Sequence, residues 1–287
     1  MTALAAKWGG VPWTLLQQCQ NSESQQDWDL RRAVSRAVEN HATFLPALHT
    51  LDGQDVGTSA IFFVLPLKDR TGNIYRRRYI VCVPTATLQN ALAIALQQMQ
   101  NQARIDFFLL MSVHPGTRSC ARNIYANWIF SLITLGRTIY CNWNEYNSGL
   151  SSALGTLRAE QIPVIRDAAK VMNPPYYWIA PRWEFPGIDF ALVTRLGIVA
   201  IQVVISFQPS SPQIGLDRLQ EVLPVRWKQN SKVPWGFLFV GISKELVDNA
   251  LKCCADRLTI GATKNQTVYV GSCVVDPIEL AGIPYKV

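Results

Sequence analysis

The chain has 287 residues, 49% hydrophobic and 16% charged, which excludes a disordered protein and allows one large domain or two modest ones. The formal net charge of +7 favours a polyanion such as nucleic acid, or an acidic protein, as a partner. Seven scattered cysteines without a Cys-x-x-Cys pair, and only three histidines, argue against a zinc site and favour free thiols in a reducing compartment.

The first part of the chain is expected to mix helices with a pair of strands. The predicted elements are a helix over 27–40, strands over 59–67 and 74–83, a helix over 88–99 and an apolar segment over 105–113 that suits a helix or a strand. Thr85 or Thr87 is expected to cap the second helix. Pro115 and Gly116 mark a break, where we place a domain boundary between 1–115 and 116–287.

The second predicted strand begins with the densest basic and aromatic cluster of the chain. It contains Arg76, Arg77 and Arg78 between Tyr75 and Tyr79. Arginine makes bidentate contacts with phosphate and tyrosine stacks on bases, so these residues are candidates for nucleic-acid binding. A charged strand edge that prevents aggregation is the alternative interpretation.

In the second part, strands and helices alternate, which predicts a mixed α/β layer with one central sheet. The predicted elements are a helix over 118–135, a strand over 138–143, a partly helical connection over 147–172, a strand over 198–205, a helix over 216–223, a strand over 235–240, a helix over 244–257 and a strand over 266–274. No internal repeat is present. No apolar run reaches the length of a membrane span, and residues 1–13 do not resemble a signal peptide.

The segment over 186–206 has the strongest functional pattern. Asp189 ends a short extended segment, and a tight connection leads to a β-branched apolar strand that is interrupted only by Gln202. A hairpin would bring the two side chains together on adjacent strands, as metal-dependent nucleases arrange their ligands. A buried strand with one hydrogen-bonded glutamine is the alternative.

Several familiar catalytic patterns are missing from the sequence. There is no phosphate-binding G-x-x-x-x-G-K-[ST] loop and no G-x-S-x-G nucleophile motif. His41, His49 and His114 do not fall into a recognisable triad, and the proximity of His114 to Cys120 in sequence does not define a catalytic pair.

Short motifs in one order give the chain a family resemblance. These motifs are residues 7–13, 115–125, 186–190, 201–206 and 235–240. Together they resemble the C-terminal region of fungal and oomycete Crinkler and retrotransposon-hot-spot type proteins. The resemblance implies that 1–115 is a smaller α/β region joining an NTPase module to a nuclease. It also implies that 116–287 is a restriction-endonuclease-like domain of the PD-(D/E)XK class, with a mixed sheet flanked by helices.

The resemblance assigns roles to individual residues, and several depart from the family pattern. Asp189 matches the metal-binding aspartate, and Gln202 matches the second ligand position. Val204 stands where nucleases have lysine, and Ala126 stands where the first helix usually carries glutamate. Trp13 replaces the arginine of the Gly-Gly-x-Pro-Arg segment.

These departures predict a weakened metal site. Mg²⁺, the cofactor implied by the resemblance, prefers charged oxygen ligands, and phosphodiester cleavage needs an activated water. Glu184 is a candidate replacement acid, and Lys228 or Lys232 a candidate replacement for the missing lysine.

The resemblance implies an effector-like intracellular protein, with the nucleus as a candidate location, and the departures from the family pattern imply that it binds DNA with little or no cleavage. One alternative is an active metal-dependent DNase that uses Asp189, Gln202 and Glu184. The other is a protein-interaction module that binds a host protein or a second copy of itself and contacts no nucleic acid. No membrane partner is expected.

Overall fold

The computed structural model describes the elements that build two compact units. The described residues are 18, 20–39, 63–68, 74–83, 85–113, 117–134, 139–143, 156–157, 164–165, 176–179, 186–193, 197–207, 211–223, 234–254, 258–260 and 266–281. The first unit comprises Met1–Asn127 with Pro284–Val287, and the second comprises Trp128–Ile283. The boundary predicted after residue 115 remains a prediction.

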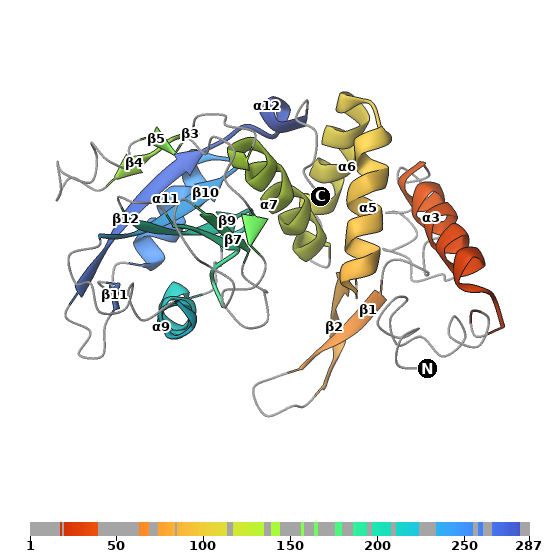
Figure 1. Ribbon diagram of the computed structural model, residues 1–287, viewed down its shortest axis with the longest axis horizontal. Helices are drawn as coiled ribbons and strands as arrows, with labels where there is room; N and C mark the ends of the chain where they lie inside the picture. The colour runs from red at the N-terminus through yellow and green to blue at the C-terminus, as the bar shows by residue number, and fades with distance from the viewer. Residues whose placement is uncertain are drawn as a thin grey trace. The chain divides into compact units, whose positions relative to one another are not determined.

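The first unit contains helices and one separate hairpin (Figure 1). Its elements are α3 (Glu23–Glu39), β1 (Phe63–Lys68), β2 (Ile74–Cys82), α5 (Ala86–Gln98), α6 (Asn101–Val113) and the first part of α7 (Arg118–Thr134). Thr85 caps α5, because its side chain accepts a hydrogen bond from the backbone N–H of Leu88 at 3.1 Å. The apolar segment over 105–113 is helical, and Phe107, Phe108 and Met111 are fully buried in it.

The second unit is organised around a mixed eight-stranded sheet. Its strands lie in the order β11 (Thr259–Ile260), β12 (Gln266–Val274), β10 (Trp235–Gly241), β9 (Ile198–Val204), β8 (Phe190–Val193), β7 (Tyr176–Ile179) and β6 (Val164–Ile165), and β4 (Asn142–Trp143) also pairs with β12. The strands β9, β10 and β12 run parallel to each other, whereas β8 is antiparallel to β9. The predicted α/β class with a mixed central sheet flanked by helices is confirmed.

The centre of the sheet is built from continuous apolar strands. Every residue of β8, β9 and β10 is buried, which is typical of strands covered on both faces. The helix α9 (Pro212–Val222) connects β9 to β10, and α11 (Lys244–Cys253) connects β10 to β12 and packs against all three parallel strands. Two consecutive strand–helix–strand crossovers therefore form the core of this unit.

The strand predicted over 138–143 is divided between two sheets. Its first half is β3 (Ile139–Tyr140), which pairs with β5 (Thr156–Leu157), and its second half is β4. In β4, the indole ring of Trp143 occupies the space beside Gly236 and Gly271, where an added Cβ would lie 2.7 Å and 2.6 Å from ring atoms. The described residues of the connection predicted to be partly helical are the strands β5 and β6, and the rest of it lies outside the described residues.

Candidate functional site

Asp189 lies at the start of β8, next to the end of the neighbouring strand β9. Phe190 pairs with Ile201 in the antiparallel ladder, and the backbone N–H of Asp189 also donates to the carbonyl of Ile201, at 2.9 Å. Asp189 is therefore one residue beyond the regular ladder. Its side chain is 5% exposed.

The carboxylate of Asp189 is directed at the backbone of β9. Its Oδ2 atom accepts a hydrogen bond from the backbone N–H of Val203 at 2.8 Å. Because β8 begins at Phe190, the side chain supplies an acceptor where the neighbouring strand offers no paired residue. A buried N–H without an acceptor is costly, so this contact stabilises the end of the sheet.

A close contact with α9 determines how the chain enters Asp189. Gly187 has a φ of 78°, a left-handed conformation that favours glycine, and an added Cβ would lie 2.7 Å from the carbonyl oxygen of Ser211. Gly215, in α9, is also close to this turn, and a Cβ added to it would overlap the carbonyl oxygen of Pro186. The two glycines thus allow the turn before Asp189 to lie directly against the first turns of the helix.

Gln202 lies near the end of β9, two residues before its last residue Val204, and is 1% exposed. It pairs in register with Phe239 of β10 on one side, and the segment before β8 lies on the other. Gln202 therefore lies on β9, and Asp189 lies one residue before β8, the strand that pairs with β9. The convergence of the two side chains at this end of the sheet remains a prediction. Their role as metal ligands remains a prediction.

The remaining residues of the predicted site fall in different places. Val204 is the last residue of β9 and is 2% exposed, and Ala126 is buried in the part of α7 that belongs to the first unit. Four residues lie outside the described part of the chain, namely Trp13, Glu184, Lys228 and Lys232. In the described part, Asp189 and Gln202 are therefore the two polar candidates that the sheet brings together.

This pair is a weak set of ligands for a hard cation. One carboxylate and one neutral amide provide a single formal charge, whereas Mg²⁺ is normally bound by charged oxygens together with water. One oxygen of Asp189 is already engaged with the Val203 N–H. Across the described residues, His, Cys, Asp and Glu side chains form no group of three or more that could hold a metal ion.

The arginine cluster lies in an irregular stretch of the β1–β2 hairpin. The antiparallel register is regular from Phe63↔Cys82 to Pro66↔Tyr79, and the next pair is Lys68↔Ile74. Between those last two pairs, β1 contains Leu67 alone, whereas β2 contains Tyr75, Arg76, Arg77 and Arg78. The cluster therefore coincides with a large bulge, a feature that increases local twist and changes the direction of a strand.

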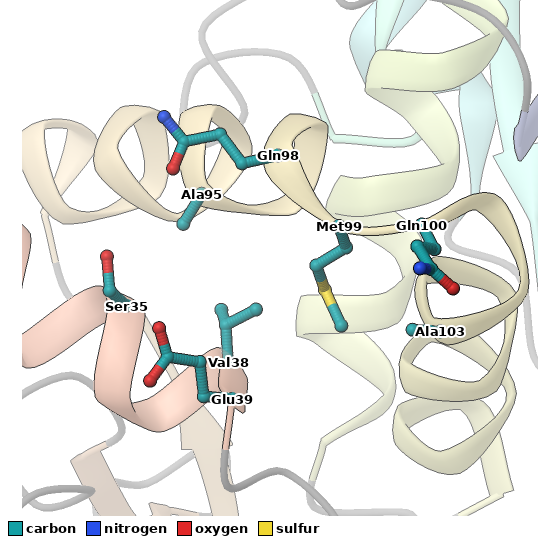
Figure 2. A pocket seen from close by; sticks show the side chains of 8 residues that line it. All are labelled: Ser35, Val38, Glu39, Ala95, Gln98, Met99, Gln100 and Ala103. Atoms are coloured by element: carbon teal, nitrogen blue, oxygen red, sulfur yellow. The ribbon is translucent and has the colours of Figure 1, made fainter.

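Two pockets that the sequence did not reveal lie between α3 and α5 in the first unit. One has a volume of about 330 Å³ and the other about 490 Å³, and both are lined by Ser35, Ala95 and Gln98. Figure 2 shows the smaller pocket, with Ser35, Val38 and Glu39 from α3 facing Ala95 of α5 and the thioether of Met99. The smaller pocket is also lined by Ala103 of α6, so its lining comes from three separate helices, and no sequence motif predicts it.

Comparisons with protein-family models, with curated proteins and with solved structures found no match. Among the described helices, none combines the length and the apolar character needed to cross a lipid bilayer.

Proposed function

We propose that the second unit is a restriction-endonuclease-like domain of a DNA-binding protein, and that its metal site is too weak for efficient cleavage. The observation that carries the proposal is the position of Asp189, buried at the start of β8 beside Gln202 of β9. The effector-like role inside cells, including the nucleus, is part of the proposal and rests on the sequence resemblance.

The composition of the site explains why cleavage is expected to be poor. Val204 has no proton to donate to a phosphate oxygen and cannot position a water, and Gln202 adds no charge for the capture of a cation. Loss of one charge-stabilising group from an active site lowers the rate by about 10²–10³. The losses of two such groups need not multiply, but together they leave little turnover.

The hairpin of the first unit is proposed to provide much of the affinity for DNA. Arg76, Arg77 and Arg78 are consecutive residues in the bulge of β2, so three positively charged residues lie within a short stretch of the chain. A two-stranded ribbon has dimensions that fit the major groove of B-form DNA. Contacts of this kind are electrostatic and are expected to be largely independent of base sequence.

A second candidate function is favoured by the hydrogen bond between Asp189 and Val203. If that bond is the whole role of the carboxylate, the fold can serve as a protein-interaction module without nucleic-acid contact. The two candidates make opposite predictions for DNA binding by the folded wild-type protein, and a variant that keeps the hydrogen bond but removes the charge tests the metal site.

The test compares wild type with Asp189→Asn and Asp189→Ala. The asparagine side chain retains an oxygen that accepts the Val203 N–H but loses the negative charge that attracts a cation. We expect salt-sensitive DNA binding by wild type and Asp189→Asn, with no more than trace nicking of supercoiled plasmid by wild type in Mg²⁺ or Mn²⁺. Robust nicking by wild type that is lost in Asp189→Asn would establish the active nuclease instead. Absence of DNA binding by folded wild type would favour the protein-interaction module.

A further inference from the structure

Phe207 is an exposed aromatic residue three positions after the end of β9, the strand that carries Gln202. It follows β9 shortly after Gln202 and Val204, and its side chain is 61% exposed. Before it, Val204 and Ile205 are buried and Ser206 is half-buried. The chain thus passes from the core to a solvent-exposed phenyl ring within a few residues.

The backbone that carries this ring accepts a hydrogen bond from a neighbouring helix. Asn249 of α11 donates a hydrogen bond from its Nδ2 atom to the carbonyl oxygen of Phe207 at 2.7 Å. The helix itself is anchored on the sheet by buried Leu246, Val247 and Ala250. The phenyl ring is therefore exposed to solvent next to a carbonyl group that is hydrogen-bonded to α11.

The location of Phe207 distinguishes it from other exposed apolar residues, which are common on protein surfaces. The carboxyl ends of β9, β10 and β12 meet at one edge of the sheet because the three strands are parallel. Ligands of open α/β sheets bind outside this edge. Asp189 enters β8 at the same edge, because β8 is antiparallel to β9.

We propose that Phe207 stacks on an unpaired base of DNA bound along the carboxyl edge of β9. This inference rests on the proposed function and names its preferred substrate, which is DNA with a single-stranded or unpaired segment. An aromatic ring beside a bound strand stacks on any base, because every base has a flat π-face. A paired base within a regular duplex offers no such face to a surface side chain.

The experiment measures binding of fluorescently labelled DNA by anisotropy, with a regular duplex and with the same duplex containing a central unpaired bubble. The variants are Phe207→Ala, Phe207→Leu and Phe207→Trp. Val222→Ala is the matched control, since Val222 is apolar and 43% exposed and lies at the opposite end of α9 from the turn that contacts the segment before Asp189. Base stacking of one aromatic residue changes affinity by roughly 5- to 150-fold on substitution by alanine.

We expect Phe207→Ala and Phe207→Leu to lose at least about fivefold in affinity for the bubble and to keep the affinity for the regular duplex. Phe207→Trp and Val222→Ala should behave as wild type. Equal affinity of wild type and Phe207→Ala for the bubble would overturn the inference and leave the proposed DNA binding intact. Retention of affinity by Phe207→Leu would show simple apolar contact and would also overturn it. Failure of wild type to bind either DNA would remove both proposals.

Discussion

The carboxylate of Asp189 accepts the backbone N–H of Val203 at 2.8 Å, so the strongest catalytic candidate of the chain is also part of the sheet. Binding a metal ion and accepting a main-chain hydrogen bond place different demands on this side chain. A ligand needs a free oxygen and a negative charge, whereas an acceptor needs one oxygen in the right position. The first two predictions separate these demands.

Asp189→Ala is expected to lower the free energy of unfolding by about 1–3 kcal/mol, because the Val203 N–H loses its acceptor inside the sheet. Asp189→Asn should cost less, since its amide oxygen can occupy the same position. Urea denaturation of both variants measures the difference. Asp248→Ala is the control, because Asp248 forms an exposed ion pair with Lys244 and such pairs contribute about 0–1 kcal/mol. Equal losses for Asp189→Ala and Asp248→Ala would show that the hydrogen bond to Val203 contributes little.

The Gln202→Glu variant should be less stable than wild type in EDTA, and addition of Mn²⁺ should restore its stability. The substitution adds a second carboxylate to a buried position beside Asp189, and two like charges in one site repel each other. A bound cation would relieve the repulsion, and a ligand at 100 times its Kd stabilises the folded state by about 2.7 kcal/mol. The measurement is the midpoint of thermal unfolding with and without metal.

Gln202→Leu is the control for this prediction, since it changes the same buried position without adding a carboxylate. It should be destabilised to the same extent in EDTA and in Mn²⁺. A Mn²⁺ response of Gln202→Glu that persists after Asp189→Asn is added would mean that the cation binds elsewhere.

Replacement of Arg76, Arg77 and Arg78 by alanine should reduce the salt dependence of DNA binding. Each phosphate contact contributes about −0.9 to the slope of log K against log salt, so the slope should flatten by up to roughly three units. The matched control replaces Arg31, Arg32 and Arg36, three exposed residues of α3, and so removes the same charge from another part of the chain. If both triple variants change the slope equally, net charge and not the hairpin explains the affinity.

Gly236→Ala and Gly271→Ala are each expected to destabilise the second unit, because the new methyl group would overlap the indole ring of Trp143. Overpacking of a well-packed region costs typically about 1–3 kcal/mol. A second substitution, Trp143→Leu, should recover part of this loss in Gly271→Ala, although it lowers stability in the wild-type background. Additive losses in the double variant, measured by urea denaturation, would show that the ring is not the cause.

The sequence determined the elements whose stability is local or purely hydrophobic. The β-branched run over 198–205 predicted β9 as a central strand, and the structure confirms it as Ile198–Val204, buried throughout. The apolar segments of β10 and β12 were predicted for the same reason. Thr85 was one of two candidate caps, and its hydrogen bond to Leu88 needs only residues within one turn of the helix.

Only the tertiary structure decided which segments became neighbours. Pairing of β12 with β10, and of β4 with β12, joins residues far apart in the chain, and no local pattern encodes such a partner. The same holds for Trp143 over two glycines and for the bulge at the arginine cluster, which depends on the register with β1. At Asp189 the sequence predicted an acid near a buried strand. The contact with Val203 arose from the exact end of β8 relative to β9, because register is set by long-range pairing and not by residue type.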